Sequence, residues 1–151
     1  MVGSGYKGSR TGEVHGFLQA YAHPVRELAL ELRRHVFETR PSVAEAVRPG
    51  WKLIGYRTEA GAYFGFVAPA SGYVDLGFEY GFLMVDAGEL LPRGEQVRVL
   101  RLRPGNPIPA VTRRLVSEAA GLADLGRAGR ARLLMERGLL AGKIPPRQGS
   151  T

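Results

Sequence analysis

The chain has 151 residues, the length of a single domain, and its 44% hydrophobic content suffices to bury a core without cross-links. It contains no cysteine, which excludes disulfides, thiolate metal sites and cysteine nucleophiles. The formal charge of +7 comes from the second part of the chain, because residues 93–151 hold 12 basic and 4 acidic side chains.

The first part of the chain has helical periodicity. Residues 1–11 are rich in glycine, serine and basic side chains, and we predict that they are flexible. A short helix is predicted over Glu13–Tyr21, and a clear amphipathic helix over Pro24–Thr39, where apolar residues recur at i, i+3, i+4 and i+7. Ser42 is a possible N-cap, which predicts a further short helix over Val43–Val47.

The segment from Gly50 to Gly81 changes to the period of β-strands. Three strands are predicted, separated by short turns that contain glycine or proline: Lys52–Arg57, Ala62–Ala68 and Tyr73–Tyr80. Because such short turns join only antiparallel strands, the three strands predict an antiparallel meander.

The remainder of the chain returns to helix after one more strand. Phe82–Gly94 is predicted as an irregular connection. Val97–Arg103 alternates valines with arginines, which predicts a fourth strand at an edge of the sheet. Helices are predicted over Ala110–Leu125 and about Arg127–Leu140, and residues 141–151 are predicted as a flexible tail.

This order of elements predicts the fold class. Helices, then antiparallel strands, then helices indicate an α+β domain over residues 12–140. We expect an antiparallel sheet of about four to five strands packed with N- and C-terminal helices.

Four segments in the middle of the chain carry a resemblance to a known family. They read PVRELALELRRHVFETRP, GWKLIGYR, AYFGFVAP and YVDLGFEYG. With them, residues 14–121 resemble the YdhG-like bacterial domain of unknown function (domain-of-unknown-function family 1801). The resemblance implies a compact α+β domain, and most members have no assigned activity. One branch of the family is similar to frataxin in architecture, which implies iron handling.

A metal site would have to use the main helix. Glu27, Glu31 and His35 lie at i, i+4 and i+8, on one stripe of that helix. Since the ends of the stripe are about 12 Å apart, one ion would contact Glu31 and His35 together with a ligand from elsewhere. The alternative is a solvated helix face on which Glu27 pairs with Arg34.

Glycines inside the predicted strands point to a different kind of site. If the hairpin register pairs Gly65 with Gly77, the sheet has a bare patch that admits either a crossing helix or a ligand. The ligand hypothesis predicts a shallow pocket with aromatic walls and basic anchors. Its residues would be Trp51, Lys52, Tyr56, Arg57, Tyr63, Gly65, Tyr73 and Gly77.

The sequence favours binding over catalysis. No nucleophile–base pair, metal triad or phosphate-binding glycine loop can be read from it. Our main hypothesis is a non-catalytic cytoplasmic domain that binds a small molecule or a protein and needs no cofactor. The alternatives are frataxin-like iron handling through Glu31 and His35, and nucleic-acid binding through the arginines of residues 93–151. No membrane partner is expected, because no stretch approaches the roughly 18 apolar residues that span a bilayer.

Overall fold

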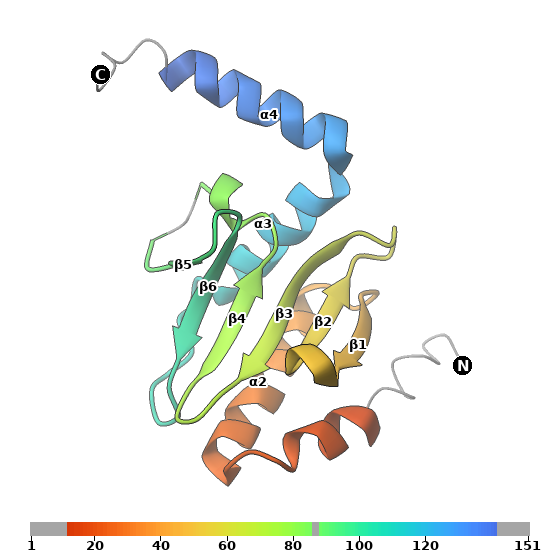
Figure 1. Ribbon diagram of the computed structural model, residues 1–151, viewed down its shortest axis with the longest axis vertical. Coiled ribbons are helices and arrows are strands. Elements are labelled where there is room, and N and C mark those ends of the chain that lie inside the picture. Colours follow the sequence, from red (N-terminus) through yellow and green to blue (C-terminus); the bar gives the residue numbers. More distant parts are fainter. Residues whose placement is uncertain (1–11, 86–87, 142–151) are drawn as a thin grey trace.

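The protein is described here from a computed structural model that covers residues 12–85 and 88–141. It has the predicted α+β architecture, with one antiparallel sheet and helices from both ends of the chain (Figure 1). The segments predicted to be flexible, residues 1–11 and all but the first residue of 141–151, lie outside the described residues.

The sheet has six strands in the order β1-β2-β3-β4-β6-β5, and all neighbours are antiparallel. The predicted meander is confirmed and forms its centre, as β2, β3 and β4. The strand bounds are β1 Ala44–Arg48, β2 Leu53–Arg57, β3 Tyr63–Pro69, β4 Val74–Phe78, β5 Leu91–Arg93 and β6 Val97–Leu102.

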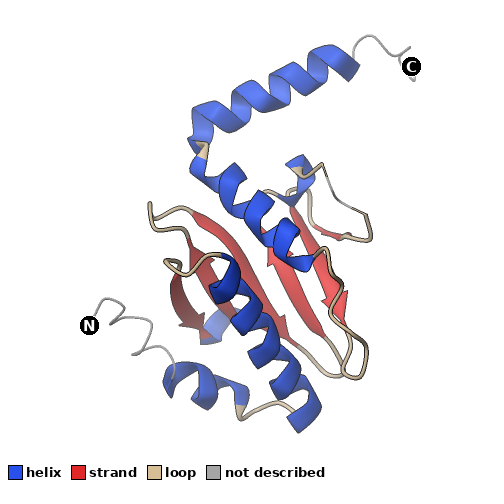
Figure 2. Ribbon diagram, turned by 180° about the vertical axis from the view of Figure 1, so that it is seen from behind, coloured by secondary structure: helices blue, strands red, loops and turns tan. Residues whose placement is uncertain are grey.

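Two helices cover one face of this sheet. They are α2 (His23–Thr39) and α3 (Thr112–Asp124), and Figure 2 shows them side by side in front of the strands. A short helix over residues 12–18 precedes α2, and α4 (Gly126–Ala141) follows α3 and extends beyond the sheet (Figure 1). The opposite face carries no α-helix of the described residues, and we call it the open face.

The core lies between the helices and the sheet. The apolar stripe of α2 faces the strands, and its members are all buried: Val25, Leu28, Ala29, Leu32 and Val36. The strands contribute the side chains of one face to the same core, including Ile54, Tyr56, Phe64, Val67, Leu76 and Phe78. Strict alternation is interrupted on β3, where the register with β2 shifts beside Phe64. The other set of strand side chains lies on the open face.

The predicted helix over Val43–Val47 is wrong, because this segment forms the edge strand β1. β1 pairs with β2, so that Glu45 lies opposite Tyr56. The Glu45 carboxylate is fully buried and accepts hydrogen bonds from Arg33 at 2.7 and 2.9 Å and from the Tyr56 hydroxyl at 2.9 Å. These tertiary contacts outweigh the local capping signal of Ser42.

The edge position predicted for the fourth strand is also wrong. That strand is β6, which lies between β4 and β5, while β5 lies in the segment predicted as irregular. The register that would create a bare patch does not form, because Gly65 pairs with Phe78 and Gly77 pairs with Phe66. Of the arginines that suggested an edge, Arg98, Arg101 and Arg103, Arg101 instead pairs with Asp75 on the neighbouring strand.

Candidate ligand-binding site on the open sheet face

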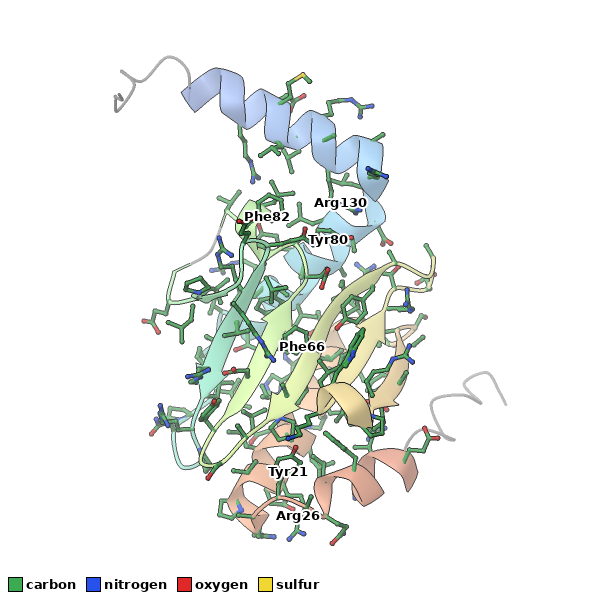
Figure 3. The ribbon with its side chains drawn as sticks, in the orientation of Figure 1. Tyr21, Arg26, Phe66, Tyr80, Phe82 and Arg130 are labelled. Atoms are coloured by element: carbon green, nitrogen blue, oxygen red, sulfur yellow. The ribbon has the colours of Figure 1, made fainter. Side chains whose placement is uncertain are left out.

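A small hydrophobic cluster covers the middle of the open face. Its buried members are Leu53, Phe66, Ala68 and Val99, and Tyr63 and Val97 pack against them. Figure 3 shows Phe66 on the face turned toward the viewer, away from α2 and α3. No α-helix of the described residues covers this open-face cluster.

The strand glycines make room for the aromatic rings of this cluster. A Cβ on Gly77 would lie well inside 3.0 Å of three carbons of the Phe66 ring, and a Cβ on Gly55 would lie 3.1 Å from the Tyr63 ring. On Gly65 it would meet the Gly77 carbonyl oxygen at 2.5 Å. The glycines are therefore covered by rings and backbone, and the bare patch that they suggested does not form.

A single turn of 3₁₀ helix, η1 (Pro49–Trp51), forms the rim beside β1 and β2. Its end is closed by a hydrogen bond from the Lys52 N–H to the Pro49 carbonyl at 3.1 Å. Lys52 has φ 60°, and it is the one non-glycine residue with positive φ in the described part of the chain. The turn leaves the Trp51 side chain 72% exposed at the edge of the open face.

A hollow of about 970 Å³ lies on the open face between this rim and β5. Its apolar walls and floor come from Trp51, Leu53, Tyr63, Phe66 and Val97. Three guanidinium groups and one carboxylate also line this first hollow, and they belong to Arg48, Arg57, Arg93 and Glu79.

The arginines of the first hollow are not neutralised by nearby acids. Arg57 lies over the Tyr63 ring at 5.7 Å and donates to the Gly61 carbonyl at 3.0 Å, while Arg93 lies over the Phe66 ring at 5.1 Å. Neither Arg48 nor Arg93 forms an ion pair with a carboxylate of the described residues. Two cations thus remain available to an anion.

Burial raises the pKa values of two groups that line the first hollow, Glu79 and Tyr63. It raises the pKa of Glu79 above its ordinary value, although Gln96 donates a hydrogen bond to this carboxylate at 3.0 Å. Burial, and secondarily the nearby Glu79, raises the pKa of Tyr63 to about 12. Tyr63 therefore stays neutral at physiological pH, and the hollow as a whole is apolar and positively charged.

A second hollow of about 480 Å³ adjoins the first and shares Trp51 and Arg93 with it. Lys52 and Tyr73 line it, together with Asp75 and Arg101. Arg101 binds the Asp75 carboxylate through two hydrogen bonds of 2.8 and 2.9 Å, and its guanidinium lies 3.9 Å from the centre of the Tyr73 ring.

The structure divides the eight residues of the ligand hypothesis among three places. Trp51, Arg57 and Tyr63 line the first hollow, and Lys52 and Tyr73 line the second. Tyr56 is fully buried on the helix-covered side, and Gly65 and Gly77 lie beneath other groups.

Arg48, Glu79 and Arg93 line the first hollow and were not predicted from the sequence as pocket residues. Alternation along Tyr73–Tyr80 places Glu79 on one face with Tyr73 and Asp75, which was a local signal for it. Arg48 carries a second signal. In strand register it lies opposite Leu53 and shares its face, but the helix expected over Val43–Val47 concealed this alternation.

The residues of the metal hypothesis lie on α2, away from both hollows. The His35 ring Nδ1 is 2.9 Å from the Glu31 carbonyl oxygen, and Arg34 contacts the Glu31 and Glu38 carboxylates at 3.7 Å, in place of the expected Glu27 pairing. Within residues 12–85 and 88–141, no three His, Cys, Asp or Glu side chains group closely enough to hold a metal ion.

Several arginines of residues 93–151 make contacts within the fold. Arg101 pairs with Asp75, and Arg113 pairs with Glu38. Arg130 lies 3.8 Å from the centre of the Tyr80 ring and donates to two carbonyls at the end of α3 (Figure 3). Much of the basic excess therefore makes contacts within the fold.

Comparisons with known proteins find no matching family model, curated protein or solved structure. The resemblance to the YdhG-like domain, and the iron role that it implies, therefore stay predictions. Among the described helices, none has both the length and the apolar character needed to cross a membrane.

Proposed function

We propose that this chain is a non-catalytic binding domain that takes a small anionic molecule with a flat apolar body in the first hollow. One observation carries the proposal: three guanidinium groups, from Arg48, Arg57 and Arg93, surround an apolar floor, and none of them forms an ion pair with a carboxylate of the described residues.

The guanidinium groups and the apolar floor favour the same kind of ligand. A guanidinium group binds carboxylates and phosphates in a planar, bidentate way, and it does so more strongly where water is partly excluded. The floor of Phe66, Leu53 and Val97 excludes water and favours an apolar ring. A volume near 970 Å³ is within the range of small-molecule sites.

The lining groups favour binding without chemistry. Among the described residues, those that line the first hollow include no serine, histidine or lysine. Tyr63, with a pKa of about 12, is a poor acid or base at neutral pH. Glu79 is then the remaining candidate for proton transfer, and no nucleophile lines the hollow beside it.

The single tryptophan makes the proposal easy to test. Trp51 lies at the rim of the first hollow, so its fluorescence reports binding there without a label. We expect deoxyadenosine monophosphate, an aromatic anion, to quench it in a saturable way. Neutral deoxyadenosine and inorganic phosphate should each bind at least tenfold more weakly, because each offers one half of the required chemistry.

A matched pair of variants assigns the signal to the site. Arg93→Gln removes a charge from the first hollow, whereas Arg132→Gln removes the same charge from an exposed position on α4. The first should weaken binding of the monophosphate about tenfold and the second should leave it unchanged. Equal affinities for the two variants, or no saturable quenching by the monophosphate, would overturn the proposal.

A further inference from the structure

We infer that the two hollows form one continuous site for a segment of single-stranded nucleic acid, with Trp51 as the stacking surface between two phosphate subsites. The inference rests on the proposed function, because it takes the first hollow as an anion site. It adds the second hollow, the role of Lys52 and the chemical class of the ligand.

Continuity of the site is the first observation. The two hollows share Trp51 and Arg93, so a ligand that leaves one enters the other beside these two side chains. Cations lie in both parts, since Arg48 and Arg57 line the first hollow and Lys52 lines the second. A ligand that uses the whole surface therefore has an anionic group at each end and a ring between them.

The backbone at Lys52 is the second, independent observation. A left-handed conformation with φ 60° costs free energy for a lysine, and glycine would adopt it at no such cost. The fold nevertheless has a lysine there, directly after the exposed Trp51 and on the wall of the second hollow. Strain of this kind persists only where the surrounding structure holds it, and it clusters at binding and catalytic sites.

Single-stranded nucleic acid is the ligand class in which rings and anionic groups alternate in this way. In a single strand every base has a phosphate on each side, and an exposed aromatic side chain stacks on a base without reading its identity. Trp51 is 72% exposed, so a base can lie against its ring without displacing another side chain. A duplex does not fit this arrangement, because its bases are already stacked on one another.

The test compares one nucleotide with several. We expect a five-residue oligodeoxyadenylate to quench Trp51 at concentrations at least tenfold lower than deoxyadenosine monophosphate. The logarithm of its affinity should fall with the logarithm of salt concentration, by about 0.7 for each phosphate neutralised. An oligonucleotide that binds no more tightly than the monophosphate would overturn this inference and leave the proposed function standing. If neither ligand quenches, both fail.

The variant Lys52→Gly removes the charge of Lys52 without weakening the fold. The variant relieves the left-handed backbone, so its melting temperature should equal or exceed that of the parent chain. It should weaken the oligonucleotide at least fivefold, as should Lys52→Asn, whereas Arg132→Gln on α4 should leave the oligonucleotide unchanged. Unchanged oligonucleotide affinity in both Lys52 variants would overturn the inference. So would a polyglutamate peptide of equal charge that binds as tightly as the oligonucleotide.

Discussion

The close approach of Phe66 to Gly77 predicts a substitution whose cost depends on a second residue. In Gly77→Ala the new Cβ would overlap three carbons of the Phe66 ring, which must withdraw until contacts of at least 3.4 Å are restored. Because the Gly77 backbone is held in the ladder with β3 and β6, the ring has to move. Overpacking of this kind destabilises a protein by about 1–3 kcal/mol.

Phe66→Leu should remove most of that penalty. Alone, it loses part of a buried ring and should cost about 1 kcal/mol. Combined with Gly77→Ala, it leaves the new methyl group an uncrowded position, so the double variant should be more stable than the sum of the two changes by about 1–2 kcal/mol. The Gly77→Ala variant should also lose affinity for the monophosphate, since the displaced ring moves into the first hollow.

Urea unfolding followed by far-ultraviolet circular dichroism measures these free energies. Two other glycine-to-alanine variants serve as controls, one expected to destabilise the protein and one expected to stabilise it. Gly65→Ala should be destabilising whatever stands at position 66, because its Cβ meets a backbone oxygen at 2.5 Å. Gly121→Ala, exposed on α3 with nothing within 4 Å, should stabilise by about 0.5–1 kcal/mol. If Gly77→Ala lowers the free energy of unfolding by the same amount with leucine as with phenylalanine at position 66, the overlap with the Phe66 ring is not the cause.

Three other predictions concern ionisable groups. Burial raises the pKa of Tyr63 to about 12 and that of Tyr56 well above its ordinary value of 10. The free energy of unfolding should therefore fall as the pH rises above 10, because the unfolded chain then loses protons that the folded chain keeps. Replacing both tyrosines with phenylalanine should reduce this loss, which melting curves at alkaline pH would measure. Since the pKa of Glu79 is raised, its ionisation on going from acid to neutral pH opposes folding. The stability of Glu79→Gln relative to the parent chain should therefore increase as the pH rises over that range. The variant should also bind the monophosphate more tightly. Glu45→Ala removes the acceptor of Arg33 and Tyr56 and should cost about 3–5 kcal/mol in urea unfolding, and a cost below 1 kcal/mol would show that the pair is not needed.

The centre of the sheet could be predicted because its signals are local. Gly61 and Gly72 have φ of 92° and 88°, which only glycine adopts readily, and they mark the turns between β2, β3 and β4. β1 has no comparable signal. Its sequence AEAVR has one large apolar residue, and its strand conformation depends on pairing with β2 and on contacts of Glu45 with a helix residue twelve positions earlier.

The candidate site was predictable only in part, for a related reason. Within β2, alternation alone places Arg57 and Tyr56 on opposite faces, so the sequence held the signal that separates them. Arg48 and Arg93 come from the two edge strands, and no local pattern shows that they line one hollow. Their approach follows from the order of six strands, which depends on long-range pairing of β4 with β6.

The two faces of the sheet are connected through β1. On the helix side, Glu45 fixes this edge strand to α2 through Arg33 and to β2 through Tyr56. Three residues later the same strand places Arg48 in the first hollow, and η1 follows with Trp51. A buried ion pair often contributes little net stability, but it fixes one arrangement of the chain against others. Here that arrangement determines the positions of Arg48 and Trp51, which would contact a ligand. The buried pair therefore affects binding by placing these two residues, although it does not itself touch the ligand.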